Sequence, residues 1–500
     1  MVGLDVASGE LTSSEDQSRT LPPPLLIWAA LAAATAVGFA LRAAFVADQS
    51  LGYEEVFTAS VIGHPTAAGV WNAVDATEST PPLYYLLTWC WVHLTGSDTE
   101  TALRTTSLLA GVATIPAAFL AARRFVTPRL ALAVAWLSAV SPLLVVYSIY
   151  ARSYALLVLL ATLSVWALGA VLERPTPRRW LLWALAAAGC LWTHYFTVFL
   201  LIGEAAVLLV RLPHARIRLV GALALAAAAA APLEALFRSQ NAHTGRTAFI
   251  AAQPLAGRLE AIPRQFAMGL NVPHAWLEGA GILLVVVAAA FSAARLRRSP
   301  GAQALAAIAL IAAGLPIVTA VTGIDDHLLP RNVAAVWICL APLAAYGLTR
   351  LRGLPLLAYS ATCLAAVVTV LGDWHYQGST DWRGASGRIR AQAGGAPVAV
   401  IPAVELDVAG RYMQRSPLAA PVRTADLWVM VEPLRAAGQR ALNPVPGSEV
   451  TGVWDPALRP VAEVDYRGFR LIHLRSPAPV VVRPLPAAGG VAPTAQLLAP

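Results

Sequence analysis

Residues 152–179 read RSYALLVLLATLSVWALGAVLERPTPRR, and this stretch decides the class of fold. Between Arg152 and Glu173 it holds 20 consecutive residues, 153–172, that are predominantly apolar. A helix of about 20 such residues crosses the hydrocarbon core of a bilayer, whereas a helix of a soluble domain keeps one polar face. The segment 153–172 therefore predicts a transmembrane helix.

The composition of the whole chain agrees with this reading. Of 500 residues, 57% are hydrophobic and 13% are charged, whereas soluble domains have about 45–50% apolar and about 25% charged residues. The four cysteines, Cys90, Cys190, Cys339 and Cys363, lie in apolar runs without metal-ligand spacing. Composition thus excludes a soluble globular protein, a disulfide-rich secreted protein and a largely disordered chain.

Eleven apolar stretches bounded by charges or turn residues predict transmembrane helices. They are 24–46, 104–122, 129–147, 153–172, 180–193, 196–210, 217–236, 277–294, 302–322, 332–349 and 354–372. A further run, 82–95, has only 14 residues, a length that favours a re-entrant or juxtamembrane helix. We expect an all-α polytopic membrane protein with about 11 transmembrane helices and one such short helix.

The basic residues predict the orientation of the chain. All 36 are arginines, and the formal net charge is +8. If 82–95 does not cross, one set of loops holds fourteen arginines against a single acid, Glu173: Arg123, Arg124, Arg129, Arg174, Arg178, Arg179, Arg211, Arg216, Arg218, Arg295, Arg297, Arg298, Arg350 and Arg352. The positive-inside rule makes this face cytoplasmic. The arginines thus predict a multi-pass protein of the cell (plasma or inner) membrane with a cytoplasmic N-terminus, and no nucleic-acid partner.

The composition changes after residue 372. Short β-rich runs, 398–401, 427–431, 470–474 and 480–482, alternate with helix-like stretches at 382–392 and 405–414, a pattern typical of a small α/β domain. Eleven crossings place this domain outside the cytoplasm. The expected organisation is a disordered cytoplasmic tail (1–23), a transmembrane domain (24–372), an extracytoplasmic α/β domain (373–485) and a loose tail (486–500).

An acidic pair, Glu54 and Glu55, follows the first apolar stretch. Two carboxylates at the outer mouth of a helical bundle could deprotonate a hydroxyl or hold a cation. For an arbitrary Glu-Glu pair, solvated loop acids are the simpler interpretation. The surrounding motifs decide between these alternatives.

Several motifs occur in a characteristic order along residues 25–395. They are ESTPPLYY (78–85), ALR (102–104), YSIYARSY (147–154), THYF (193–196), HLLPRN (327–332) and DWR (381–383). Together they resemble the polyprenyl-phosphate-dependent glycosyltransferases of the GT-C superfamily, in the branch similar to protein O-mannosyltransferases and aminoarabinose transferases, and most of all its actinobacterial members. The resemblance implies a polyprenyl-phosphate sugar donor, mannose or a similar sugar, and an extracytoplasmic acceptor that is a protein, a glycan or a lipid.

The resemblance also implies catalytic residues. The Asp-Glu pair of the family maps onto Glu54 and Glu55, where the first acid is Glu instead of the usual Asp. Tyr150 stands where the family has Glu, in its Glu-Ala-Arg motif. These departures keep open a catalytically inactive binding subunit. A lipid-linked-glycan transporter or flippase is a further alternative, but the inverted repeats that it would need are not evident in the sequence.

Other polar residues are candidates for donor binding. Arg152 and Arg331 lie in short outer loops, where arginine is otherwise scarce, and a lipid phosphate would explain them; pairing with Asp325, Asp326 or lipid headgroups is the alternative. Arg104 is a weaker phosphate candidate that could instead organise its loop through Asp98 or Glu100. Sugar or donor contacts are expected from His194, Tyr195, Tyr150 and His327. No metal-ligand spacing is present; no cofactor is required, although the acidic pair could recruit a divalent cation.

Overall fold

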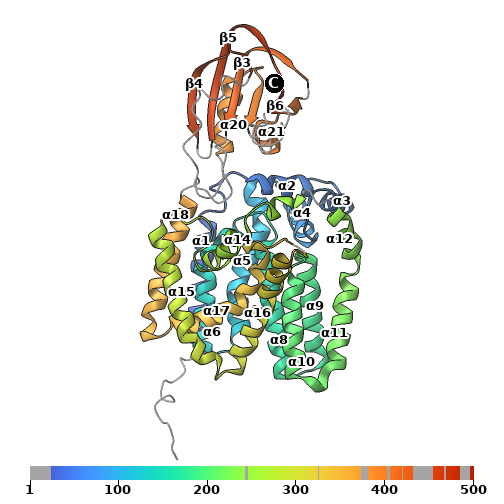
Figure 1. Ribbon diagram of the computed structural model, residues 1–500, viewed down its shortest axis with the longest axis vertical. Helices are drawn as coiled ribbons and strands as arrows, with labels where there is room; N and C mark the ends of the chain where they lie inside the picture. Colours follow the sequence, from blue (N-terminus) through green and yellow to red (C-terminus); the bar gives the residue numbers. More distant parts are fainter. Residues whose placement is uncertain are drawn as a thin grey trace, which may run out of the picture.

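The protein consists of a helical domain and a smaller domain built on a β-sheet (Figure 1). The structure, a computed structural model, describes residues 24–242, 246–324, 326–372, 381–401, 406–418, 420–431, 454–466, 469–484 and 496–499. The expected N-terminal tail, 1–23, lies outside the described residues. The small C-terminal domain expected as part of the fold class is thus present.

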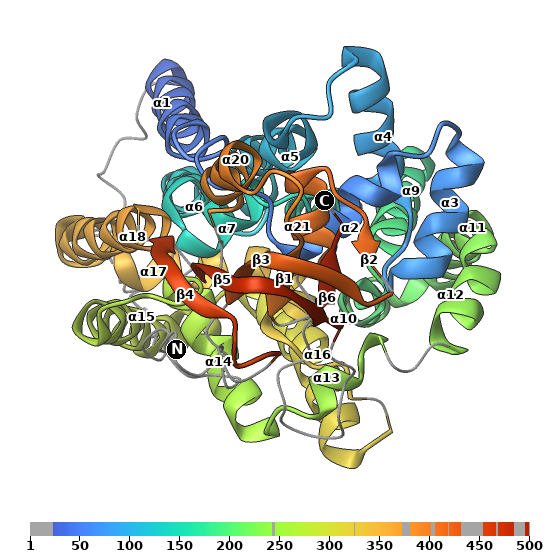
Figure 2. The ribbon, with the colours of Figure 1, turned by 90° about the horizontal axis from the view of Figure 1, so that it is seen from above.

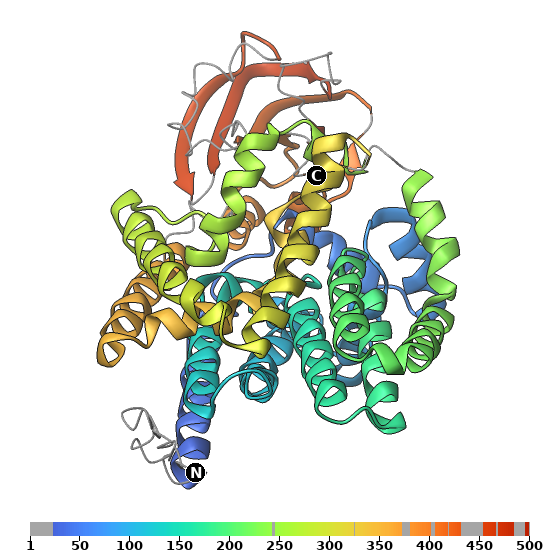
Figure 3. The ribbon, with the colours of Figure 1, turned by 60° about the horizontal axis from the view of Figure 1, so that its bottom comes forward.

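Each of the eleven apolar stretches is helical. The helices in these stretches are α1 (Pro24–Ala43), α5 (Glu100–Ala122), α6 (Pro128–Val140), α7 (Pro142–Ser148), α8 (Tyr154–Glu173), α9 (Pro177–Thr193), α10 (Thr197–Arg211), α11 (Arg216–Ala230), α15 (Ala275–Leu296), α16 (Pro300–Thr322), α17 (Trp337–Leu348) and α18 (Leu354–Gly372). Helices α15, α17 and α18 form one side of the domain, and α8 to α11 form the other (Figures 1 and 3).

Within the described part of the chain, seven helices are long and apolar enough to cross a membrane, and nine spans result if each bent helix pair counts as one. The all-α membrane fold is therefore confirmed, while the count of eleven remains a prediction. The difference comes from α9, α10 and α11, which have 17, 15 and 15 residues. Glu204 joins α10 to its neighbours α8 and α9, because its carboxylate accepts hydrogen bonds from Ser164 of α8 at 2.7 Å and Trp183 of α9 at 2.6 Å.

The expected span 129–147 is two helices, α6 and α7, which meet at an angle of 55°. Pro142 has no N–H to donate to the carbonyl four residues earlier, so it interrupts the helix. The buried Arg42 of α1 donates to that carbonyl, of Ser138, at 3.0 Å and to that of Ala139 at 2.9 Å. Arg42 thus satisfies backbone groups that the bend leaves unpaired in a region without water.

Short elements gather on the side of the helical domain that faces the sheet domain (Figure 1). They are α2 (Tyr53–Ile62), α3 (Ala67–Thr77), α4 (Leu83–Thr95), α12 (Pro232–Ala242), α13 (Ala248–Ala251), α14 (Leu255–Met268) and the 3-10 helix η3 (Pro330–Val336). Further 3-10 turns are η1 (Pro213–Ala215) and η4 (Leu351–Gly353). Helix α4 is the short helix expected over 82–95.

The C-terminal domain is a six-stranded mixed sheet with the order β2-β6-β1-β3-β5-β4. Its elements are α20 (Trp382–Gln392), β1 (Val398–Ile401), α21 (Leu406–Met413), β2 (Pro417–Leu418), β3 (Val422–Val431), β4 (Arg459–Tyr466), β5 (Phe469–Val482) and β6 (Gln496–Leu498). Strand β1 is parallel to β3, and the remaining pairs are antiparallel. Strand β6 lies within the expected loose tail, 486–500, and pairs with β1 and β2, so residues 496–498 belong to the sheet.

Helices α20 and α21 cover one face of the sheet and also dock on the helical domain (Figure 2). Arg383 of α20 donates to the carbonyls of Ala47 and Asp48 at 3.0 and 2.6 Å. Tyr412 of α21 accepts a hydrogen bond from the Leu51 backbone at 2.6 Å. The C-terminal domain therefore holds the loop that leads into α2.

Candidate active site

Helix α2 carries the acidic pair at its first turn. It begins after Gly52, whose backbone N–H donates to the Glu55 carboxylate at 2.9 Å. Successive residues of an α-helix point about 100° apart. Glu54 and Glu55 therefore face different surroundings although they are adjacent in sequence.

Glu55 faces inward and forms a buried ion pair with Arg104 of α5. Both residues are at most 2% exposed, and the Glu55 carboxylate accepts from Arg104 Nε at 2.8 Å and Nη2 at 2.7 Å. It also accepts from the Ala151 backbone at 2.7 Å. The other Arg104 donors bind carbonyls of the loop before α2, those of Val46, Gln49 and Ser50. This saturation favours a structural role for both residues over the catalytic and phosphate-binding roles expected from the sequence.

Glu54 faces a cluster of polar groups, and its carboxylate is partly exposed. Its side chain is 28% exposed, and its carboxylate accepts a hydrogen bond from Arg331 Nη1 at 2.6 Å. The Tyr150 hydroxyl donates to it at 3.3 Å, and Arg152 Nε lies 3.7 Å away. Burial by itself would raise the pKa of this carboxyl, but Arg331 and Arg152 outweigh it, so the pKa of Glu54 lies below its ordinary value.

Arg152 is held by a second carboxylate, that of Glu78. Two parallel hydrogen bonds of 2.8 Å each join the guanidinium to Glu78, which is 4% exposed. Arg331 and Arg152 also lie against rings, Arg331 5.8 Å from the centroid of Tyr154 and Arg152 5.9 Å from that of Tyr85. Asp326, the alternative partner considered for these arginines, pairs instead with Arg258 at 2.5 and 2.7 Å. Asp325 lies outside the described residues.

The other candidates divide between this cluster and its margin. His194 is 4% exposed; burial, Arg331 and Arg152 together lower its pKa to about 4, so the ring is neutral at pH 7. Tyr150 donates to Glu54, and burial together with Glu54 and Glu55 raises the pKa of its phenol. Tyr195 instead donates to Gln240 of α12 at 2.9 Å, and His327 contacts Thr247 at 2.9 Å. Of the four expected sugar or donor contacts, the structure thus brings Tyr150 against Glu54 and His194 within electrostatic reach of Arg331 and Arg152.

Glu78 is the functional candidate that the sequence analysis did not single out, although it opens the ESTPPLYY motif. A signal was present: an acid next to a Pro-Pro turn on the outer face, where Arg152 needs a partner. No group of three or more His, Cys, Asp or Glu side chains that could hold a metal ion occurs among the described residues. The carboxylates of Glu55 and Glu54 pair with Arg104 and Arg331.

Residues 79–234 match the family model described as dolichyl-phosphate-mannose-protein mannosyltransferase. No curated protein sequence matches the chain. The matched segment contains Arg104, Tyr150, Arg152 and His194, but not Glu54 or Arg331.

Solved structures show the same fold. ArnT from Cupriavidus metallidurans in the apo state superposes with a TM-score of 0.56 at 15% identity, covering 90% of this chain and 97% of that chain. ArnT from the same organism bound to undecaprenyl phosphate superposes with a TM-score of 0.55 at 16% identity, covering 90% and 98%. The likeness extends over both domains, and it confirms the GT-C-like fold expected from the motifs.

Proposed function

We propose that this chain is a polyprenyl-phosphate-dependent glycosyltransferase of the GT-C superfamily, and that it transfers a sugar from a polyprenyl-phosphate donor to an extracytoplasmic acceptor. The observation that carries the proposal is the open Glu54 carboxylate between Arg331 and Arg152, at the end of the bundle that the C-terminal domain covers. A carboxylate beside guanidinium groups supplies what such a transfer requires: a proton acceptor and a binding site for the leaving phosphate.

In the proposed reaction an acceptor hydroxyl attacks the anomeric carbon of the donor. The new carbon–oxygen bond forms as the bond from the anomeric carbon to the phosphate oxygen breaks. Glu54 accepts the hydroxyl proton, and the electron pair of the broken bond leaves with the polyprenyl phosphate. Arg331 stabilises the negative charge that grows there, because charge-assisted hydrogen bonds to guanidinium are about twice as strong as neutral ones.

Arg331 is proposed to exchange partners during the reaction. Without a donor it neutralises Glu54, which lowers the affinity of that carboxylate for a proton. A phosphate offers Arg331 two oxygens in the fork geometry that guanidinium prefers. Binding of the donor would then release Glu54 from its strongest partner and make it a better base. Arg152 remains fixed by Glu78 and contributes its positive charge from that position.

The proposed identity of the sugar rests on the description of the matching family model. The family description names a mannosyltransferase, which supports mannose or a similar hexose or pentose. The ArnT structure bound to undecaprenyl phosphate supports a polyprenyl phosphate as the product lipid. We propose no obligatory metal, because the carboxylates of the site are paired with arginines. Retention of transfer in a chelator such as EDTA tests this part.

We also propose that Glu54 and the C-terminal domain lie outside the cytoplasm. Arginines of the loops expected inside join helix ends at the opposite end of the bundle (Figure 1): Arg124 pairs with Glu173 at 2.5 Å, Arg218 binds the Pro175 carbonyl at 2.7 Å, and Arg211 the Pro300 carbonyl at 3.2 Å. This clustering supports the orientation given by the positive-inside rule.

Thiol labelling tests the orientation. A cysteine introduced at Ser97, after α4, should react with an impermeant thiol reagent added to intact cells. The experiment needs a background in which the exposed Cys90 is replaced by alanine. Protection of the new cysteine until the membrane is permeabilised would contradict both the orientation and the non-crossing α4.

The activity is tested with purified protein in lipid nanodiscs and a labelled undecaprenyl-phosphate mannose. We expect label to leave the lipid and to appear on an extracted cell-envelope acceptor, with undecaprenyl phosphate as the second product. A transporter would move the intact lipid and leave the sugar–phosphate bond unbroken. An inactive subunit would bind undecaprenyl phosphate without turnover. Either result would overturn the enzymatic proposal.

A further inference from the structure

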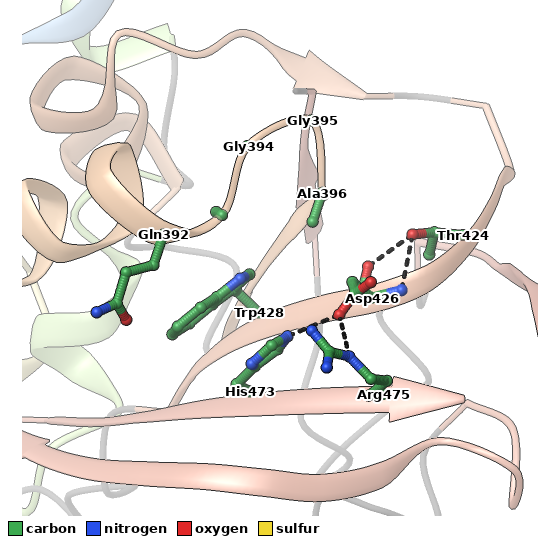
Figure 4. A pocket seen from close by; sticks show the side chains of 10 residues that line it. Gln392, Gly394, Gly395, Ala396, Thr424, Asp426, Trp428, His473 and Arg475 are labelled. Carbon is green, nitrogen blue, oxygen red and sulfur yellow. Dashed lines mark hydrogen bonds and ion pairs between the residues drawn. The ribbon is translucent and has the colours of Figure 1, made fainter. Parts of the chain in front are cut away.

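The C-terminal domain holds a cavity of about 330 Å³ that takes no part in the proposed reaction (Figure 4). Its rim is the turn Gly394–Ala396 that follows α20, and its walls are side chains of β3, β5 and the end of α20. The lining side chains that matter here are Gln392, Thr424, Asp426, Trp428, His473 and Arg475. Its volume falls within the range of small-ligand sites, about 300–1,000 Å³.

The cavity arises because α20 is shorter than the strands that it covers. Alternate residues of a strand share a face, so Asp426 and Trp428 point to the same side of the sheet. Their cross-strand partners on β5 are Arg475 and His473. The apolar cluster beneath the helices includes Trp428, which is 4% exposed, whereas the side chains of Asp426 and Arg475 are 37% and 59% exposed. The end of the helix therefore leaves one polar pair of the sheet uncovered.

The polar side chains of the cavity are fixed in place. Asp426 Oδ1 accepts from His473 Nε2 at 2.9 Å and from Arg475 Nε at 2.8 Å. The rings of His473 and Trp428 stack with centroids 4.3 Å apart and planes 3° apart. Thr424 bonds both the N–H and the carbonyl of Asp426, at 3.1 and 2.6 Å, where the register of β3 and β5 shifts. Such irregularities re-aim side chains, and a fixed site loses little entropy on binding.

The remaining hydrogen-bonding capacity defines the class of ligand. The hydrogen bond from Arg475 holds the pKa of the Asp426 carboxyl below its ordinary value, so the two charges cancel near pH 7. The two charged side chains that line the cavity therefore compensate each other, and Arg415, which is not part of the lining, directs its donors to the rim carbonyls of Ala396 and Gly394 at 2.6 and 3.1 Å. Within the described part of the chain, Asp426 Oδ2, the terminal nitrogens of Arg475 and the Gln392 amide keep free acceptors and donors. Adjacent sugar hydroxyls, each able to donate and accept, match this mixture.

We infer that the cavity at the end of α20, formed by Gln392, Asp426, His473 and Arg475, binds a neutral saccharide unit. The first turn of α20 contacts the loop before α2 through Arg383, whereas the cavity lies at the opposite end of this 11-residue helix. It is therefore a second site, separate from Glu54. Saccharide binding at this cavity is independent of the proposed function. Only the further identification of the saccharide as a remote unit of the acceptor glycan rests on the proposed function.

Binding is measured with the full-length protein in amphipol, because the headgroups of maltoside detergents are themselves saccharides. The probes are methyl mannopyranoside, methyl glucopyranoside and a linear mannotriose, titrated by saturation-transfer NMR. We expect at least one of these probes to bind the wild type. Replacement of Gly395 by Trp should weaken its binding at least tenfold, since a side chain there enters the rim, and an added Cβ meets nothing within 4 Å.

The matched control is Gly387→Trp on the exposed face of α20, where an added Cβ also meets nothing within 4 Å; it should bind like the wild type. Gln392→Ala, which disturbs no hydrogen bond among the described residues, should weaken binding several-fold. Glu54→Gln should retain it, so that failure of transfer and failure of this inference are told apart. No binding of any probe to the wild type, equal binding by Gly395→Trp, or displacement of the saccharide by inorganic phosphate would each overturn the inference.

Discussion

Glu54 and Glu55 are adjacent in sequence, yet they are bound in opposite ways. Glu55 is 1% exposed and its partners, Arg104 and two backbone N–H groups, leave no room for a substrate. Glu54 is 28% exposed, and its partner Arg331 is itself 27% exposed. The first pair is buried, whereas the second is partly exposed, at the site proposed to bind a lipid phosphate.

The comparison separates what an ion pair does for the fold from what it does for chemistry. Arg104 fixes the loop before α2 by binding three of its carbonyls, and Glu55 compensates the charge that this requires. A buried pair of this kind stabilises little by itself, but breaking it leaves an uncompensated charge in the interior. Glu54 is partly exposed, and its removal leaves Arg152 paired with Glu78 and Arg331 27% exposed, so its loss should affect catalysis far more than folding.

The largest effect is expected from Arg104→Met. This change leaves the Glu55 carboxylate buried without its cation, which costs about 3–5 kcal/mol. We expect a much lower unfolding temperature and poor accumulation of the protein in membranes. The matched control is Arg238→Met, which breaks the exposed pair with Glu234 and should cost about 0.3–0.5 kcal/mol. If the two variants have the same unfolding temperature, Arg104 does not stabilise the fold as expected.

Glu54→Gln should have the next largest effect, and on transfer alone. Glutamine keeps the shape and most hydrogen bonds but cannot accept a proton, so the rate should fall by about 10²-fold or more. Thermal unfolding and binding of undecaprenyl phosphate should stay close to those of the wild type. Glu54→Asp restores the residue usual in the family and should remain active.

Glu55→Gln gives the opposite pattern in the same assays, namely a lower unfolding temperature. Its rate per folded molecule should decrease far less than that of Glu54→Gln. Full activity in Glu54→Gln together with loss in a folded Glu55→Gln would exchange the two roles.

Arg331→Ala should weaken binding of undecaprenyl phosphate by about tenfold or more, since a hydrogen bond to a charged group contributes about 1.5–3 kcal/mol. Arg331→Lys should recover part of this affinity, because an ammonium group cannot make the two parallel bonds of a guanidinium. Arg264→Ala, whose partners Glu260 and Glu278 lie outside the site, is the control. If Arg331→Ala binds undecaprenyl phosphate with the affinity of the wild type, Arg331 is not a ligand of the phosphate.

The sequence was informative where the physical signal is local. Apolar runs near the thickness of a bilayer predicted the helices, and the motifs predicted the superfamily, because both are written in neighbouring residues. The bend between α6 and α7 depends on Pro142, which is visible in the sequence, but also on Arg42, which comes from another helix. The edge strand β4 was missed because its outer positions carry charges, as edge strands often do.

The site was harder to predict because its contacts join distant segments. Arg331 and Glu54 are 277 residues apart, and nothing in either motif shows that they meet. Which member of the acidic pair faces Arg331 depends on the residue at which α2 begins, and helix ends are poorly defined by sequence alone. The sequence predicts Arg104 as a phosphate ligand because nothing in it shows that Glu55 is buried and pairs with this arginine.

The smallest expected effect is a shift of the pH profile, and it distinguishes the two carboxylates without removing either. Because Arg331 and Arg152 hold the pKa of Glu54 below its ordinary value, Glu54 stays ionised as the pH falls from 7 toward the usual range of a glutamate, about 4.3. At donor concentrations far below saturation, where the rate reports the free enzyme, transfer by the wild type should therefore decline only below that range. In Arg331→Gln, burial is opposed only by Arg152 and the hydrogen bond from Tyr150, so the pKa of Glu54 rises and the decline should move to higher pH. His194, with a pKa of about 4, titrates in the same window, and Glu54→Gln separates the two: its residual activity should show no acid decline if Glu54 is the titrating base. An acid decline that persists in Glu54→Gln would assign the titration to His194, and the neutral ring beside Arg331 would become the better candidate for the base.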